Sequence, residues 1–168
     1  MYDIFMPEML SRHTIRLPFY DYSQAGTYFV TLTTCHRQPI FGNLINGKID
    51  LSKAGLIVKK EWLSLPQHFP NIQVDRYIIM PDHFHGIIII VKGQTFEGSK
   101  TQKNGPHAGS LGVIVGLFKS RVTRMIWKES TMSGIKVWQR NYYEHIIRDD
   151  EDYRRIWEYI EANPEADL

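Results

Sequence analysis

The stretch Tyr77–Ile90, YIIMPDHFHGIIII, places runs of β-branched residues on either side of a proline and an aspartate. β-Branched residues favour strands, and the Pro81-Asp82 pair interrupts them as a turn does. The stretch therefore predicts two neighbouring antiparallel strands, NIQVDRYIIMP before the break and HFHGIIIIVK after it.

Two histidines, one residue apart, begin the second of these strands. Side chains alternate along a strand, so His83 and His85 should lie on one face and Phe84 on the other. Burying two imidazoles without partners is costly, and a divalent metal ion, a phosphate or a carboxylate would relieve that cost. A structural pair, with one histidine at the strand end and the other hydrogen-bonded to backbone, explains the spacing equally well.

The rest of the chain alternates between strand-like and helix-like patterns. The further elements expected are a strand over Gly26–Pro39, a helix capped by Ser52 that ends before Pro66, an amphipathic helix over Leu111–Lys128, a strand over Val137–Arg148 and a final helix over Asp149–Asn163. The resulting order, β, α, β, β, α, β, α, suits an α+β fold. It predicts a ferredoxin-like antiparallel sheet with helices packed on one face.

The composition is that of an ordinary globular protein, with 43% hydrophobic and 23% charged residues. We expect one domain over residues 1–168, with a mobile loop at 93–110, where polar residues and glycines show no apolar period. There is no run long enough for a membrane span and no signal-peptide pattern, so we expect a cytoplasmic protein with no membrane partner. The net charge of +2 does not by itself indicate nucleic acid.

The predicted final helix carries a tyrosine and an amide one turn apart. Tyr159 and Asn163 are four residues apart and therefore share a helix face. Other apolar residues can fill the buried stripe of this helix, which leaves the Tyr159 hydroxyl at the edge of the packed face. The alternative is that Tyr159 is a half-buried packing residue and that Asn163 only ends the helix.

Four segments of the chain resemble the REP-associated tyrosine transposases, a branch of the HUH single-tyrosine nucleases and transposases. The segments are YDYSQAGTYFVTLTT, MPDHFHGIIII, LGVIVGLFKSRVTR and WQRNYYEHIIRDDEDYRRIWEYIEANP, and the similarity spans about residues 12–164. The resemblance implies an HUH-type catalytic domain. Such a domain would nick and rejoin single-stranded DNA at palindromic hairpins through a 5′-phosphotyrosine intermediate.

The same resemblance implies roles for particular residues. His83, His85 and Asn163 would bind a divalent ion, and Tyr159 would attack the DNA. Two imidazoles and an amide oxygen leave positions open for phosphate oxygens, which suits Mg²⁺ or Mn²⁺. In this branch asparagine replaces the glutamine that insertion-sequence relatives carry as third ligand.

Cationic side chains are expected to contact the DNA phosphates. They are Lys119, Arg121, Arg124 and Lys128 on the amphipathic helix, with Arg76, Arg140 and Arg148 near strand ends. Glu144 and His145 are the candidates for taking the phenol proton. Two other functions stay open: a hairpin-binding protein without catalysis, and a nuclease that activates water with its metal. Monomer and homodimer are both open as well.

Overall fold

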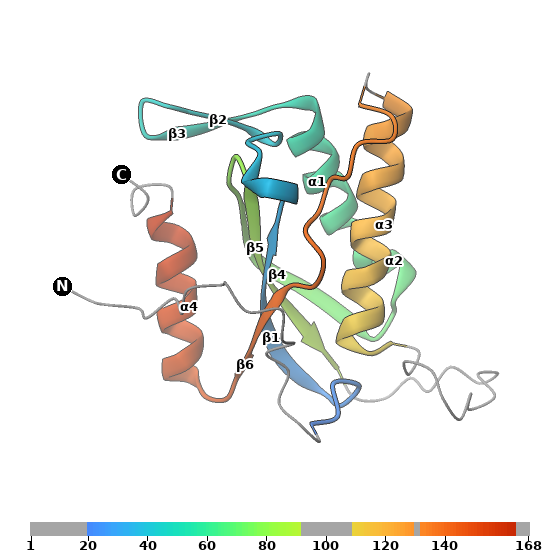
Figure 1. Cartoon of the computed structure of the whole chain (residues 1–168). Helices are drawn as coiled ribbons and strands as arrows, with labels where there is room; N and C mark the ends of the chain where they lie inside the picture. The colour runs from blue at the N-terminus through green and yellow to red at the C-terminus, as the bar shows by residue number, and fades with distance from the viewer. Residues whose placement is uncertain (1–19, 92–108, 130–131, 164–168) are drawn as a thin grey trace, which may run out of the picture.

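The computed structural model describes residues 20–91, 109–129 and 132–163 (Figure 1). At its centre is a four-stranded sheet of antiparallel neighbours, ordered β4-β5-β1-β6. Its strands are β1 (Gly26–Thr33), β4 (Ile72–Ile79), β5 (His83–Ile90) and β6 (Tyr143–Ile147). This order and these directions confirm the predicted ferredoxin-like α+β sheet.

Strands β4 and β5 form the hairpin that the sequence predicts. Residues 80–82 connect them, and the backbone N–H of Met80 donates to the carbonyl of His83 at 2.9 Å. On its other edge β5 pairs with β1, and the register sets His85 opposite Thr31. The histidines therefore lie on an inner strand of the sheet, with a neighbouring strand on each side.

Among the described residues, four helices accompany the strands, and two of them begin at a polar side-chain cap. The four helices are α1 (Lys53–Leu63), α2 (Leu65–His68), α3 (Leu111–Glu129) and α4 (Asp150–Ala162). As predicted, the hydroxyl of Ser52 caps α1 by accepting from the backbone N–H of Gly55 at 3.1 Å. The carboxylate of Asp149 caps α4 in the same way, and acidic residues fill the first turn of α4, where negative charge is favourable.

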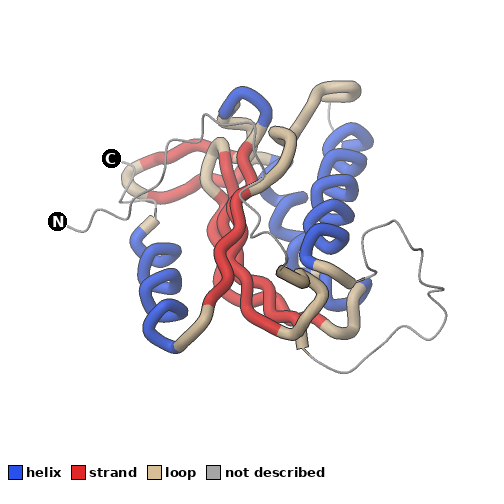
Figure 2. Tube along the Cα trace, turned by 60° about the horizontal axis from the view of Figure 1, so that its bottom comes forward, coloured by secondary structure: helices blue, strands red, loops and turns tan. Residues whose placement is uncertain are grey.

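Helices cover both faces of the sheet. Figure 1 shows α1 and α3 on one side and α4, in red, on the other; the turned view in Figure 2 agrees. The larger core cluster contains Tyr28 and Ile88, whereas Phe29 and Ile87 pack with α4 residues in a second cluster. The expectation that all helices share one face is therefore wrong for α4. Strands β1 and β5 carry apolar side chains on both faces, so each face needs a cover.

The first strand is shorter than predicted. It ends at Thr33, and Cys35–Arg37 forms a short 3₁₀ turn instead of the expected extension to Pro39. Within the turn, His36 and Arg37 have φ values of 56° and 52°, in the left-handed region that side chains rarely adopt. Backbone hydrogen bonds to Thr34 and from Cys35 to a later segment hold this turn in place.

The strand predicted over Val137–Arg148 is also shorter, because β6 begins only at Tyr143. Asn141 has a φ of 66°, which breaks the extended conformation, and asparagine tolerates that region better than most residues. Before it, Trp138 forms only an isolated bridge with Thr34. This segment therefore passes beside the end of β1 as an irregular connection.

A small hairpin stands apart from the main sheet. It consists of β2 (Gly42–Ile45) and β3 (Lys48–Leu51), joined by the Asn46-Gly47 turn that the sequence indicates. The predicted loop at 93–110 lies outside the described residues except for its last two positions. Within the described ranges, no helix has the length and apolar character needed to cross a membrane.

Candidate active site

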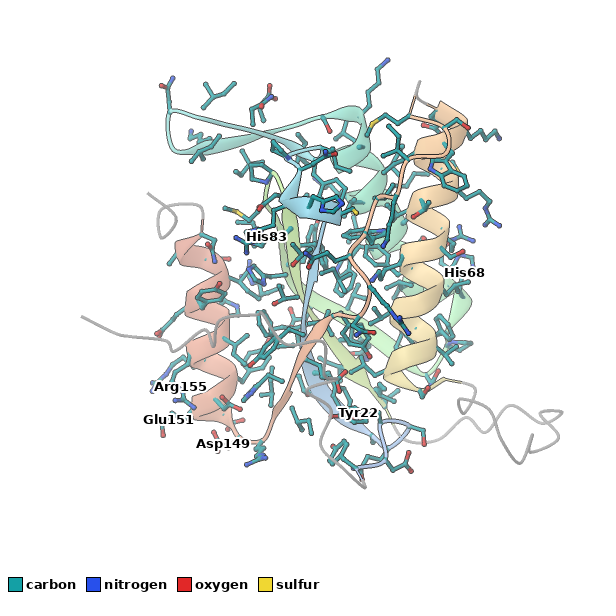
Figure 3. The ribbon with its side chains drawn as sticks, viewed as in Figure 1. Tyr22, His68, His83, Asp149, Glu151 and Arg155 are labelled. Carbon is teal, nitrogen blue, oxygen red and sulfur yellow. The ribbon has the colours of Figure 1, made fainter. Side chains whose placement is uncertain are left out.

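His83 and His85 lie at the start of β5, on the face that α4 covers. Their rings are 4.7 Å apart between centroids, and both side chains are buried. Figure 3 shows His83 at the start of β5, on the side of α4, far from Asp149 at the beginning of that helix. The predicted alternation is confirmed, since Phe84 packs on the opposite face against Trp62. The pair therefore faces the C-terminal half of α4.

The ring of His85 is held on both of its nitrogens. Its Nδ1 lies 2.8 Å from the hydroxyl of Thr31 on β1, and its Nε2 lies 3.3 Å from the hydroxyl of Tyr159 on α4. Phe29 stacks on the ring with centroids 5.4 Å apart. Burial, and then the charge of His83, lower the pKa of His85 to about 3, so this ring is neutral at neutral pH.

The ring of His83 is held by the residue that precedes it. Its Nδ1 lies 2.6 Å from Oδ1 of Asp82. Oδ2 of Asp82 lies 3.9 Å from Nε of Arg37, whose side chain is largely exposed in the left-handed turn after β1. Arg37, Asp82 and Thr31 are site residues that the sequence pattern does not single out. Asp82 could have been found from its position directly before His83. Thr31 could not, because its contact with His85 depends on the register between β1 and β5.

Tyr159 is the tyrosine that the fold brings to the histidines. Its ring also meets Phe29 edge-on, with centroids 6.2 Å apart, and α4 presents it half-buried over β1 and β5. Two other tyrosines near the C-terminal helix, Tyr153 and Tyr142, have different surroundings. Tyr153, two turns earlier, donates its hydroxyl to Asp75, and this bond, burial and the Asp75 charge raise the pKa of Tyr153 to about 12. Tyr142 packs in the cluster on the other face.

Asn163 ends α4 and is tied to Tyr159 rather than directly to a histidine. Its backbone N–H and its side-chain Nδ2 both donate to the carbonyl of Tyr159, at 3.3 and 3.0 Å. The side chain is buried, with 3% of the residue exposed. The arrangement places the amide one turn beyond the tyrosine, as the sequence spacing predicts.

The histidine geometry fits a divalent metal ion. Both Nδ1 atoms are engaged by neighbouring oxygens, which leaves Nε2 as the ring nitrogen for a metal. Nε2 of His85 also contacts the Tyr159 hydroxyl, so an ion bound there would lie beside that hydroxyl or displace it. Among the described residues, no group of three or more His, Cys, Asp and Glu side chains is placed to hold an ion. A site here would therefore combine His83 and His85 with an oxygen from Asn163 or from the DNA itself.

Neither candidate for the proton acceptor lies beside Tyr159. Glu144 is on β6 but points to the opposite face, because it alternates with Tyr143 and His145. His145 shares the face of α4, and its Nε2 lies 2.7 Å from Oδ2 of Asp152 near the start of that helix. The structure thus gives His145 a role in anchoring the beginning of α4. Glu144 lies on the opposite face of the sheet, so the expectation that it could take the proton of Tyr159 is not supported.

The cations predicted to contact DNA divide into two groups. Two of those on α3 are used within the chain. Nε of Arg121 lies 2.5 Å from Oε2 of buried Glu61, and Nζ of Lys119 donates to the carbonyls of Gln139 and Asn141 at 2.7 and 2.9 Å. Burial and the charge of Lys136 lower the pKa of Lys119 to about 8. Both side chains therefore have a structural role, whether or not they also contact DNA.

The remaining cations are exposed. They are Arg124 and Lys128 on α3, Arg140 and Arg148 beside β6, and Arg76 on β4. Arg76 also pairs with Glu161 at 3.0 Å and lies 4.6 Å from the ring of Trp157, so it fastens α4 to β4. The exposed arginines and lysine stay candidates for phosphate contacts.

Comparisons with known proteins show what the chain is similar to. No known family model matches the chain. An uncharacterized protein of Haemophilus influenzae (strain ATCC 51907 / DSM 11121 / KW20 / Rd) is 40% identical over 161 residues, 91% of this chain and 88% of that protein. A REP-associated tyrosine transposase of Escherichia coli (strain K12) is 25% identical over 146 residues, 85% of this chain and 68% of that one.

A solved structure shares the fold. It shows a REP-associated tyrosine transposase bound to a REP hairpin, and it matches with a TM-score of 0.60 at 18% identity over 90% of this chain and 74% of that chain. This match supports the α+β fold with its antiparallel sheet. In sequence and in fold, the chain is therefore similar to the REP-associated tyrosine transposases.

Proposed function

We propose that this protein nicks and rejoins single-stranded DNA at palindromic hairpins, with Tyr159 as the nucleophile and with a divalent ion held by His83, His85 and Asn163. The observation that carries the proposal is the 3.3 Å approach of the Tyr159 hydroxyl to Nε2 of His85. A tyrosine that only packs also takes a hydrogen-bond partner for its hydroxyl. This contact, however, sets the phenol oxygen beside the histidine pair, where a nucleophile would meet a phosphate held by a bound ion.

The proposed reaction exchanges one phosphodiester for another. The Tyr159 oxygen attacks the scissile phosphorus, a phosphorus–oxygen bond to Tyr159 forms, and the bond to the 3′ oxygen breaks. The phenol loses its proton, and the leaving 3′ oxygen takes one up. The products are a 5′-phosphotyrosine and a free 3′-hydroxyl, and attack by such a hydroxyl on the phosphotyrosine rejoins a strand without ATP.

The main contribution of the protein is to position the Tyr159 hydroxyl for attack. The half-buried ring of Tyr159 is confined between Phe29 and His85, so its hydroxyl has little freedom before attack. A bound Mg²⁺ or Mn²⁺ would supply Lewis acidity at the scissile phosphate. An ordinary tyrosine pKa is about 10, so the phenol must lose its proton as the new bond forms.

DNA binding is supported by the family and by the exposed charge. The solved relative is bound to a REP hairpin, and we infer the same class of partner for this chain. Arg37 is exposed beside Asp82, and Arg140 belongs to the segment that passes the end of β1. Both cations flank the end of the sheet that carries the histidines, where a phosphate backbone would have to pass.

The test uses hairpin-bearing single strands, labelled at either the 3′ or the 5′ end, incubated with the protein and Mg²⁺. We expect a denaturation-resistant protein adduct that carries only the 3′ label, together with a shorter free strand that carries the 5′ label. Cleavage without any adduct would contradict the proposal in favour of hydrolysis by water. Binding without cleavage would reduce the protein to a hairpin-binding module.

A further inference from the structure

The two histidines of the candidate site are held through the same ring atom by different chemical groups. Nδ1 of His83 lies 2.6 Å from a carboxylate oxygen of Asp82, and Nδ1 of His85 lies 2.8 Å from the hydroxyl of Thr31. These groups differ in what they dictate. A hydroxyl either donates or accepts, whereas an ionised carboxylate only accepts. Asp82 alone therefore determines where the proton of its histidine sits.

The consequence for His83 is a single neutral tautomer. Because the carboxylate of Asp82 requires a proton on Nδ1, the neutral ring carries its lone pair on Nε2. That lone pair is the one a metal ion would use, since Nδ1 is already occupied. Without Asp82, the neutral ring is free to place its proton on Nε2 and so lose the ligand atom.

Asp82 is itself fixed in place. Its carbonyl accepts two hydrogen bonds from Thr34, one from the backbone N–H and one from the hydroxyl, both at 2.9 Å. The flanking turn is closed by a bond from Phe41 to Pro81 at 3.0 Å. The carboxylate thus extends from a rigid backbone, and Arg37 stands 3.9 Å from its second oxygen.

We propose that Asp82 is a positioning residue, which holds His83 as the Nδ1–H tautomer and so directs Nε2 to a divalent cation. The ligand half of this inference rests on the proposed function, because it assumes the metal site. The tautomer half does not, because it concerns the protein without metal. The two halves are therefore tested separately.

The first measurement reads the tautomer in the metal-free protein. Histidine-labelled samples are compared by ¹H–¹⁵N correlation of the ring nitrogens at about pH 8, above the ordinary histidine pKa of about 6.5. We expect a protonated Nδ1 in His83 of the parent, and a shift toward protonated Nε2 or a mixture in Asp82→Ala. A persistent Nδ1–H tautomer in Asp82→Ala would overturn the proposal.

Two further variants guard this measurement. Asp82→Asn keeps the size of the side chain and the backbone bonds to Thr34, so it covers the case in which Asp82→Ala does not fold. Its amide can donate to Nδ1 as well as accept from it, so we expect a mixture of tautomers. Asp75→Asn is the matched control, since Asp75 serves Tyr153 rather than a histidine, and it should leave His83 unchanged.

The second measurement is Mn²⁺ affinity by calorimetry, with no DNA present. We expect Asp82→Ala to bind about 10- to 100-fold more weakly than the parent, the usual cost of losing a group that orients a histidine ligand. Asp75→Asn should match the parent. An unchanged affinity in Asp82→Ala would overturn the ligand half. Absence of Mn²⁺ binding by the parent would overturn the metal site of the proposed function, while the tautomer result would stand by itself.

Discussion

The hydroxyl of Tyr159 lies 3.3 Å from Nε2 of His85, although 74 residues separate the two in the chain. The contact exists because α4 packs on the face of the sheet that α1 and α3 leave uncovered (Figure 1). Phe29 and Ile87 supply the apolar surface that holds the helix there. The apolar packing of the second face thus positions the proposed nucleophile.

Removing either imidazole should abolish metal-dependent cleavage. We expect His83→Ala and His85→Ala to lose strand cleavage but keep the fold, because the core clusters on both faces remain. His85→Ala should also lower the free energy of unfolding by about 1–3 kcal/mol, since that ring is fully buried. Cleavage of a hairpin strand and thermal unfolding check these outcomes. His68→Ala, at an exposed position, is the control, and parental cleavage in both site variants would exclude the metal site.

The cations of α3 should separate into DNA contacts and a structural pair. We expect Arg124→Ala with Lys128→Ala to weaken single-strand binding most at low salt and to reduce the salt slope by about 0.7 per lost phosphate contact. Arg121→Ala should instead cost about 1–3 kcal/mol of stability, because it leaves the buried carboxylate of Glu61 without its partner. Binding across a salt series and urea unfolding measure both. An unchanged salt slope in the double variant would show that Arg124 and Lys128 are solvated surface residues that do not contact the DNA phosphates.

Gly86, between His85 and Ile87 on β5, should not tolerate a methyl group. A Cβ at this position would lie 2.6 Å from the ring of Trp62 and 2.9 Å from that of Phe84. We expect Gly86→Ala to destabilise the fold by about 1–3 kcal/mol. Gly116→Ala is the matched control on α3, where a Cβ meets nothing within 4 Å, and it should stabilise by about 0.5–1 kcal/mol. Equal stability of the two variants would show that the sheet relaxes freely around Gly86.

The anchor at the start of α4 should make stability depend on pH. Burial alone would raise the pKa of Asp152, but bonds from His145 and the Arg148 backbone, with the His145 and Arg155 charges, leave it below its ordinary value. A lowered folded pKa means that this stabilisation is present above about pH 4 and is lost as the pH falls further. Asp152→Asn should therefore cost about 1–3 kcal/mol at neutral pH and less near pH 3.

Urea unfolding at the two pH values checks this, with the exposed Asp150→Asn as the control. If the difference between Asp152→Asn and the parent were the same at both pH values, the charge of Asp152 would not be its source. A loss of adduct formation in Asp152→Asn would further show that the beginning of α4 controls the position of Tyr159.

Much of the fold is readable from local patterns. The break at Pro81-Asp82 predicts the β4–β5 hairpin, and Ser52 and the acidic run before Tyr153 mark the starts of α1 and α4. The errors in strand length arise where a local turn overrides the pattern. Asn141 leaves the extended conformation in the middle of a β-rich run, and the turn after Thr33 does the same, and neither change has a strong signal in composition.

The main residues of the candidate site can be predicted from the sequence, but the residues that hold them in place cannot. Spacing places His83 and His85 on one face and Tyr159 with Asn163 on another element, yet only the packing of α4 joins them. Thr31 depends on a register between strands that are more than fifty residues apart in the chain. The pairing of Arg121 with Glu61 depends likewise on how two helices cross, so periodicity alone could not reveal it.

The central claim is that Tyr159 forms the covalent bond to DNA, and the most direct measurement identifies the attached residue. Adducts formed with a hairpin strand and Mg²⁺ are digested with protease and nuclease, and the nucleotide-bearing peptide is sequenced by mass spectrometry. We predict the modification on Tyr159, no adduct from Tyr159→Phe despite retained hairpin binding, and undiminished adduct from the control Tyr142→Phe. An adduct of parental yield from Tyr159→Phe, or a modification on Tyr142, Tyr143 or Tyr153, would contradict the claim.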